Sequence, residues 1–178
     1  MAKRKRSELE GCVLALLWAK GPSTPYAIRQ VFLDSPNPQW SGSSGSIYPL
    51  LDRLQREKLV RSKVHATGKR PGRLFSLTAA GSAAFRAWLG PPVEEWVAGV
   101  PPDPLRTRVH FLGALSTRRR ATFLREARQS ADEHLRLIEE DCRRRAREGS
   151  YEYLMARGAV MMMQARCAWL REVAESLD

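Results

Sequence analysis

The sequence predicts a mainly α protein with a small β-wing: a winged helix-turn-helix domain followed by an α-helical dimerisation domain. Residues 1–90 are typical of three helices, two strands that flank a basic turn, and a fourth helix. Residues 91–103 are rich in proline, which interrupts regular helix. Residues 104–178 show helical apolar spacing again. We therefore expect one domain at 1–90, a linker at 91–103 and a helical domain at 104–178.

The first 90 residues carry almost all of the chain's positive charge. The chain has 178 residues and a formal net charge of +11. Residues 1–90 contain 15 basic and 5 acidic side chains, whereas residues 91–178 contain 15 and 14. A basic half beside a nearly neutral half indicates a module that binds a polyanion, joined to a second module.

The start of the chain carries two helix signals. Ser7 and Glu10 form a capping box, in which each side chain bonds the other residue's backbone N–H. A second helix begins near Thr24, with Pro25 at its first position, where the missing N–H costs nothing. Trp40 is expected in the core beneath the third helix.

A third helix and a hairpin complete the first domain. The helix begins near residues 43–46, and its apolar stripe comprises Ile47, Leu50, Leu51 and Leu54. Strands at 59–65 and 74–77 enclose a basic turn at 67–73, and Thr78 caps the helix that follows.

This arrangement suits duplex DNA. A major groove about 12 Å wide admits one helix, and the start of that helix offers free N–H groups to phosphate. Small hydroxyl residues at the helix start allow the backbone to approach, and a basic hairpin reaches the flanking strand. For Asp52 we favour an ion pair with Arg56, four residues later, over a contact to cytosine. The residues that we expect to contact DNA on these grounds are Ser43, Ser44, Ser46, Tyr48, Arg53, Lys69, Arg70 and Arg73.

Two blocks of sequence resemble the PadR family of transcriptional regulators. They are GSIYPLLDRLQREKLV, which begins at Gly45, and FSLTAAG, which begins at Phe75. The resemblance is close over residues 9–90 and looser through 105–138, in the manner of the family's longer-tailed branch. It implies a dimer held by C-terminal helices, DNA binding at inverted repeats, usually repression, and in some members a response to small ligands such as phenolic acids. It also implies a DNA contact from Tyr26, although Pro25 and Ala27 depart from the family's usual glycine and glutamate.

The second half is expected to form the dimer. A long helix begins at Ser116 or Thr117, and a last helix follows the break at 149–150. The last helix has an apolar surface wide enough to require a partner subunit, which would place two recognition helices roughly 34 Å apart. A purely intramolecular core is the alternative. The residues assigned to dimerisation are Leu154, Met161, Met162, Ala165, Trp169 and Val173.

A small aromatic or apolar effector is conceivable between the two domains. Trp96, Phe111 and Tyr151 are the candidate lining residues, because aromatic side chains beside a linker can enclose a cavity. The same three side chains serve equally well as core.

Other function classes find little support in the sequence. The three histidines lie far apart, the three cysteines form no CxxC pair, and no phosphate loop or catalytic motif is present. We therefore expect no enzyme, metal or cofactor, no membrane segment, and a cytoplasmic location. The alternatives to a specific regulator are a non-specific, architectural DNA-binding protein and a ligand-sensing or protein-interaction module that has lost DNA binding.

Overall fold

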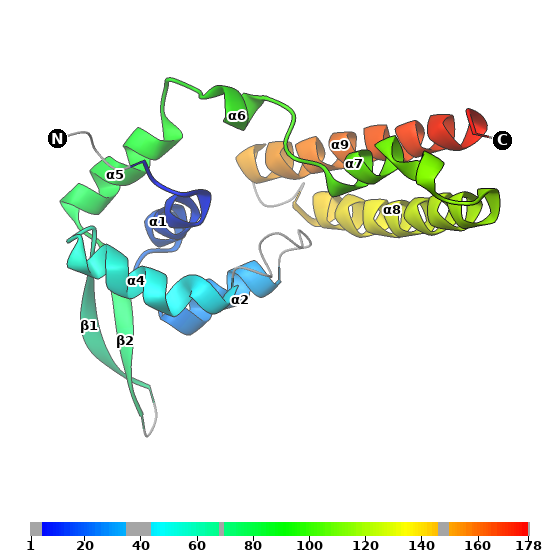
Figure 1. Ribbon diagram of the computed structural model, residues 1–178. Coiled ribbons are helices and arrows are strands. Elements are labelled where there is room, and N and C mark those ends of the chain that lie inside the picture. The colour runs from blue at the N-terminus through cyan, green and yellow to red at the C-terminus, as the bar shows by residue number, and fades with distance from the viewer. Residues whose placement is uncertain (1–4, 35–43, 68–69, 146–149, 178) are drawn as a thin grey trace. The chain divides into compact units, whose positions relative to one another are not determined.

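The chain forms two compact units, Met1–Gly99 and Val100–Asp178 (Figure 1). The computed structural model describes residues 5–34, 44–67, 70–145 and 150–177. The division between the units falls inside the proline-rich segment that was predicted as a linker. Within the part of the chain described, no helix is both long enough and apolar enough to cross a lipid bilayer.

The first unit is a winged helix-turn-helix, as the sequence predicts. Its helices surround a small core, and a two-stranded hairpin projects from them (Figure 1). Its elements are, in chain order, α1 (Glu8–Lys20), α2 (Pro25–Leu33), the 3₁₀ turn η1 (Ser44–Ser46), α4 (Ile47–Arg56), β1 (Val60–Thr67), β2 (Arg70–Leu77), α5 (Ala79–Leu89) and α6 (Glu95–Ala98).

Side chains cap the first two helices where the sequence predicts. The Glu10 N–H donates to Ser7 Oγ at 3.3 Å, and the Ser7 N–H donates to Glu10 Oε2 at 2.9 Å, so the capping box is confirmed. Thr24 Oγ1 accepts from the Ala27 N–H at 3.1 Å, with Pro25 in the first turn. Local sequence signals therefore set where α1 and α2 begin.

The core of the first unit joins all of its longer elements. The predicted stripe of α4 is buried, together with Leu14 of α1, Phe32 of α2, and Phe75 of β2. Because four buried aliphatic side chains hold one face of α4, the opposite face of this helix is turned to solvent. Trp40, predicted to lie beneath α4, is outside the described residues.

The hairpin is longer than predicted. The strands pair from Val60↔Leu77 to Thr67↔Arg70, so most of the expected turn at 67–73 is strand. The hydrogen bonds of an antiparallel strand pair join backbone groups, so polar side chains near the tip do not end the pairing. Ser23 forms an isolated β-bridge to β2, in which its backbone exchanges two 2.9 Å hydrogen bonds with Phe75. This bridge ties the start of α2 to the wing.

A close backbone approach secures α5 against the start of the hairpin. Thr78 Oγ1 donates to the Lys58 carbonyl at 2.8 Å and accepts from the Gly81 N–H at 3.0 Å. A Cβ on Gly81 would lie 2.0 Å from the Leu59 carbonyl oxygen, so this position requires glycine.

The second unit is a helical hairpin with a short helix before it. Its elements are α7 (Pro104–His110), the 3₁₀ turn η2 (Leu112–Ala114), α8 (Thr117–Arg145) and α9 (Ser150–Glu175). Asp103 caps α7 by accepting from the Leu105 N–H at 2.9 Å, and the Arg166 guanidinium of α9 bonds both oxygens of that carboxylate. Asp103 followed by Pro104 is the local sequence signal for this helix start, and the structure contains the cap.

The interface between α8 and α9 is made of small and apolar side chains. Ile138 and Cys142 of α8 pack against Ala156 and Val160 of α9. Cys142 is buried in this interface although it lies in a helix rich in charged residues. Cys142 follows Ile138 by one helical turn and so faces α9, although its neighbours in sequence are charged.

Candidate nucleic-acid interface

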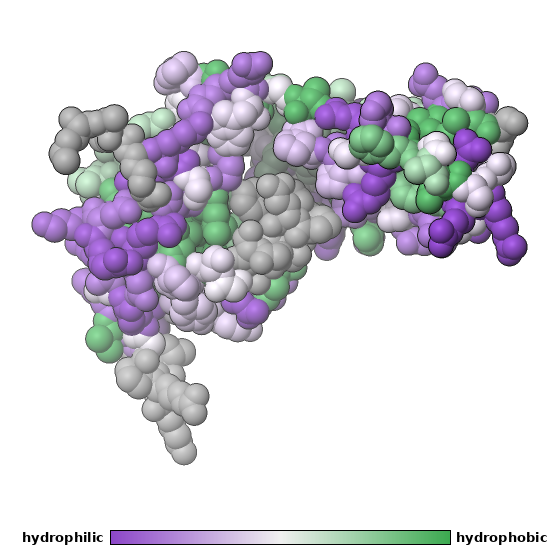
Figure 2. All heavy atoms as spheres, in the orientation of Figure 1, coloured by the Kyte–Doolittle hydropathy of each residue, from purple (hydrophilic) through white to green (hydrophobic). Residues whose placement is uncertain are grey.

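The exposed face of α4 is the first part of the candidate interface. Tyr48 is 51% exposed, whereas the neighbouring Ile47 is fully buried. The helix thus anchors itself in the core and presents the tyrosine to solvent. In Figure 2, hydrophilic side chains cover the end of α4 that leads into β1.

The N-terminal end of α4 is exposed. Gly45 and Ser46 are both exposed, and no other described residue has an atom within 4 Å of a Cβ built on Gly45. Packing within the protein therefore does not demand glycine here, and another molecule can approach this backbone closely. Ser43 lies outside the described residues, and for Ser44 only the backbone, in η1, is described.

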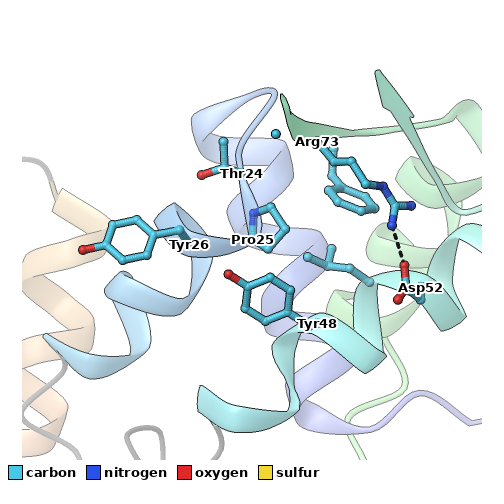
Figure 3. Close-up of a pocket in the computed structure, with 9 residues that line it drawn as sticks. Thr24, Pro25, Tyr26, Tyr48, Asp52 and Arg73 are labelled. Carbon is cyan, nitrogen blue, oxygen red and sulfur yellow. Dashed lines mark hydrogen bonds and ion pairs between the residues drawn. The ribbon is translucent and has the colours of Figure 1, made fainter. Parts of the chain in front are cut away.

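A shallow pocket of about 320 Å³ lies beside Tyr48 (Figure 3). Helices α2 and α4 and strand β2 contribute to its walls. Tyr48 from α4 lies next to Pro25 of α2, and the ring of Tyr26 points away from Pro25 (Figure 3). Tyr26 is well exposed, as a side chain available for a contact must be. The lining residues are Thr24, Pro25, Tyr26, Tyr48, Leu51, Asp52, Gly72, Arg73 and Phe75.

Arg73 of the wing lies against the same pocket. Its guanidinium carbon is 4.7 Å from the centre of the Phe75 ring, a cation–π contact. Residues two apart on a strand share a face, which brings Arg73 above Phe75. Ser62, the partner of Phe75 in the strand register, lies on the same face of the hairpin.

Asp52 pairs with Arg73, and the favoured pair with Arg56 is wrong. Arg73 Nη1 donates to Asp52 Oδ1 at 2.8 Å (Figure 3). Residues four apart on a helix are neighbours, which favours a pair of Asp52 with Arg56. Asp52 instead pairs with the guanidinium of Arg73, which the Phe75 ring holds beside it. The carboxylate therefore joins α4 to β2.

Arg53 is half-exposed and bonds a buried carboxylate. Its Nε and Nη2 lie 3.2 and 3.1 Å from Glu10 Oε1, and the Glu10 side chain is 0% exposed. Arg6 lies 4.0 Å from the same oxygen and also pairs with Glu57, beside the C-terminal end of α4. This cluster attaches α4 to the start of α1. The DNA contact predicted for Arg53 therefore involves a side chain that also binds Glu10.

Two polar residues of the candidate interface were missed by sequence reasoning. Gln55 Oε1 accepts from the Arg73 guanidinium and from Ser62 Oγ. The signal for Gln55 is its position three residues after Asp52, on the same side of α4. The signal for Ser62 is the alternation of side chains along a strand, which places Ser62 on the same face of the hairpin as its partner Phe75. Of the predicted wing residues, Lys69 lies outside the described residues, and only the backbone of Arg70 is described, as the first residue of β2.

The candidate effector residues belong to different units. Trp96 lies in the first unit, where Lys5 Nζ is 4.8 Å above its ring and its indole N–H donates to Glu94. Hydrogen bonds from Lys5 and Trp96 lower the pKa of Glu94. Phe111 and Tyr151 are exposed residues of the second unit. A shared cavity remains a prediction. Within the described residues, no three His, Cys, Asp or Glu side chains gather in a way that could hold a metal ion.

An apolar surface remains on α9 after it has packed against α8. Leu154, Met161 and Met162 are exposed, and so is Ala165, whereas Trp169 and Val173 are half-buried. Trp169 packs against the cluster formed around Leu170, so it belongs partly to the core of the unit. Hydrophobic side chains also appear at the surface over α7 and the C-terminal part of α9 (Figure 2).

Family comparisons account for both units. Residues 13–87 match the transcriptional regulator PadR-like family. The first unit is a PadR-like domain. Residues 103–178 match a second family, described as the C-terminal region of virulence activator alpha, so the chain combines the two domains in that order. A comparison with curated protein sequences found no match.

Solved structures share this architecture over the whole chain. Bacillus subtilis PadR in complex with operator DNA is 21% identical, with a TM-score of 0.83 over 98% of this chain and 100% of that one. The same protein in complex with p-coumaric acid is 19% identical, with a TM-score of 0.73 over 98% and 99%. The Vibrio cholerae virulence activator AphA is 20% identical, with a TM-score of 0.70 over 96% and 98%. At these identities the likeness concerns the fold, a PadR-like domain followed by a helical domain.

Proposed function

We propose that this chain is a dimeric, sequence-specific DNA-binding regulator of transcription, and that it represses by occupying an inverted-repeat operator. The observation that carries the proposal is the exposed Tyr48 at the open start of α4, beside the wing arginine Arg73. The PadR-like family consists of transcriptional regulators, and the similar Bacillus subtilis structure contains operator DNA.

The recognition helix enters the major groove by its N-terminal end. Gly45 and Ser46 let a phosphate approach the backbone, whose N–H groups and dipole favour an anion. Tyr48 then reaches a base edge or the sugar-phosphate strand from the exposed face of α4. The pocket beside Tyr48 gives room for a part of the nucleic acid to enter between helix and wing.

The wing supplies positive charge. Lys69, Arg70 and Arg73 of the wing neutralise phosphates of the flanking strand, a contact that carries affinity rather than sequence information. Replacing Lys69 and Arg70 by Ala should therefore weaken binding to all duplexes similarly. The dependence of affinity on salt should become less steep by about one unit per lost phosphate contact.

Tyr48 provides the direct test of the recognition face. Tyr48→Ala should weaken binding to a preferred duplex by on the order of 1–3 kcal/mol, and Tyr48→Phe shows how much of this loss belongs to the hydroxyl. Leu89→Ala is the control, because Leu89 is an exposed apolar residue of the same unit, away from α4 and the wing. Equal affinities of Tyr48→Ala and Leu89→Ala would contradict the assignment of the recognition face.

The dimer rests on the exposed side of α9. Leu154 and Met161 are large, apolar and exposed, and burying such surface against a second copy is favourable at about 25 cal/mol per Å². Two-fold symmetry then places two recognition helices about one DNA turn apart, which is the geometry of an inverted repeat.

Light scattering coupled to size exclusion tests the dimer. The wild type should elute with twice the mass of the chain, and Met161→Glu should shift it towards the monomer. Gln129→Glu, an exposed substitution on α8, is the control and should leave the mass unchanged. A monomeric wild type at micromolar concentration would refute the dimer.

Release by a small aromatic effector is the last part of the proposal. It is supported by the likeness to the Bacillus subtilis structure that contains p-coumaric acid. A phenolic acid that lowers DNA affinity and changes tryptophan fluorescence would support it. No response across a library of aromatic acids would exclude this class of effector.

A further inference from the structure

An acidic side chain lies on the face that we propose for DNA. Asp52 is 56% exposed, lies one helical turn after Tyr48 and lines the same pocket. A carboxylate near phosphate is repelled, so on charge alone Asp52 weakens DNA binding. A favourable role must therefore act through another group.

That group is the guanidinium of Arg73. Arg73 is 46% exposed, and four side chains hold it in one orientation. The Phe75 ring lies beneath the guanidinium, Asp52 accepts from Nη1 at 2.8 Å, Gln55 accepts from Nη2, and Ser62 Oγ lies 3.4 Å from Nη2. A long, flexible side chain from the wing is thereby restrained.

The restraint joins elements that are distant in sequence. Asp52 and Gln55 belong to α4, Ser62 to β1 and Arg73 to β2. The network thus fixes the wing arginine relative to the recognition helix, not merely relative to its own strand. A guanidinium has five N–H donors, and the three hydrogen bonds described use three of them. The other donors can serve an external acceptor.

We propose that Asp52 is a positioning residue for DNA recognition, which holds Arg73 in the orientation that contacts the duplex. This inference rests on the proposed function. The acceptor has the chemistry that suits a single charged N–H donor, either N7 or O6 of a guanine or one phosphate oxygen. An ordered arginine loses less conformational entropy on binding than a free one, which is the gain that Asp52 brings.

The test uses the full-length chain and two duplexes. One is the duplex that the wild-type protein enriches from a random-sequence pool, and the other is its scrambled counterpart. Asp52→Asn should weaken binding to the enriched duplex by about five- to tenfold, which lies within the range of coupling between residues in contact. It should bind the scrambled duplex at least as tightly as the wild type, because a repulsive charge is lost. Asp34→Asn, an exposed acid at the end of α2, is the matched control and should leave the preference between the duplexes unchanged.

A double-mutant cycle tests whether Asp52 acts through Arg73. In an Arg73→Ala background, Asp52→Asn should change affinity for the enriched duplex by less than about twofold, the limit for uncoupled residues. Two modified duplexes distinguish the acceptor. Loss of the Asp52 effect with 7-deazaguanine indicates a base edge, and its loss with a methylphosphonate linkage indicates phosphate.

Each outcome has a definite meaning. Tighter binding of Asp52→Asn to both duplexes would overturn the proposal, because Asp52 would then be only a repulsive charge. An undiminished effect without Arg73 would also overturn it. A wild-type protein that enriches no sequence would refute the proposed function itself. Thermal unfolding of Asp52→Asn and Asp34→Asn at the wild-type temperature shows that the fold is intact in both variants.

Discussion

Arg53 should matter for the stability of the first unit as much as for DNA. Its Nε donates a hydrogen bond of 3.2 Å to Oε1 of the fully buried Glu10, and its Nη2 forms an ion pair with the same oxygen at 3.1 Å. Arg53→Ala removes both donors and leaves the carboxylate inside the protein, with Arg6 4.0 Å from that oxygen. Breaking a buried pair costs about 3–5 kcal/mol, and a hydrogen bond to a charged group contributes about 1.5–3 kcal/mol.

The exposure of Arg53 reduces that cost. The guanidinium is 45% exposed, so water can enter the space it leaves and screen the carboxylate. We therefore expect Arg53→Ala to lower the free energy of unfolding by about 2–3 kcal/mol. Glu10→Gln keeps an acceptor for the Ser7 N–H and should cost about 1 kcal/mol. In the double variant the losses should fall short of additivity by about 1–2 kcal/mol, because the two residues contact each other.

Urea unfolding followed by tryptophan fluorescence measures these quantities. Trp18 reports the first unit, because its ring centre lies 5.5 Å from that of the buried Phe85. Arg56→Ala, which removes an exposed arginine of the same helix, is the control and should change stability by less than about 0.5 kcal/mol. Additive losses for Glu10 and Arg53, or equal effects of the two arginine variants, would refute the reasoning.

Three further predictions concern separate sites. Gly45→Ala should leave the fold as stable as the wild type, because no other described residue lies within 4 Å of a Cβ at this position. The same variant should weaken DNA binding in an anisotropy titration, because we propose that a phosphate approaches this backbone. Gly81→Ala should lower the unfolding free energy by about 1–3 kcal/mol in urea, because its Cβ would lie 2.0 Å from the Leu59 carbonyl oxygen. Burial raises the pKa of Asp103. Hydrogen bonds from a backbone N–H and from the Arg166 guanidinium together lower it by a larger amount, so the pKa of this carboxyl lies below its usual value. The charged carboxylate therefore stabilises the second unit above about pH 4, and this contribution disappears as the pH falls through the lowered pKa. Asp103→Ala should lower the free energy of unfolding by about 1–2 kcal/mol at pH 7 and should have no effect in strong acid. Unfolding measured at a series of pH values tests both expectations.

Each of these predictions has an outcome that contradicts it. Unfolding of Gly45→Ala at lower urea would mean that the start of α4 is packed rather than open. An unchanged stability of Gly81→Ala would contradict the close approach of α5 to the hairpin. A pH-independent loss for Asp103→Ala would show that the carboxylate acts as a cap without being favoured in its charged form.

The sequence predicts the local features of the fold well. The capping box at Ser7 and Glu10, the start of α2 at Thr24, and the cap at Asp103 each depend on residues within four positions of one another. Such signals act before the chain has folded, and the structure contains all three.

The contacts that build the candidate interface could not be predicted in the same way. Asp52 and Arg73 are 21 residues apart, and Glu10 and Arg53 are 43 apart. The local rule for helices favours Asp52 with Arg56, but the strand register brings Arg73 over Phe75 and within reach of the carboxylate. Cys142 shows the same limit, since its charged neighbours suggest solvent and its spacing from Ile138 turns it towards α9. The residue types and the exposed face of α4 follow from the sequence, and the partners of each side chain follow from tertiary packing.

The most direct test of the account is fluorescence anisotropy with the purified protein. The DNA upstream of the gene that encodes it and a scrambled duplex of equal length are titrated at two salt concentrations. We predict that the upstream DNA, or a duplex enriched from a random pool, binds roughly a thousandfold more tightly than the scrambled one, and that Tyr48→Ala weakens this binding by on the order of 1–3 kcal/mol. Equal binding to all of these duplexes, lost together as salt rises, would contradict a sequence-specific regulator and identify a non-specific DNA-binding protein.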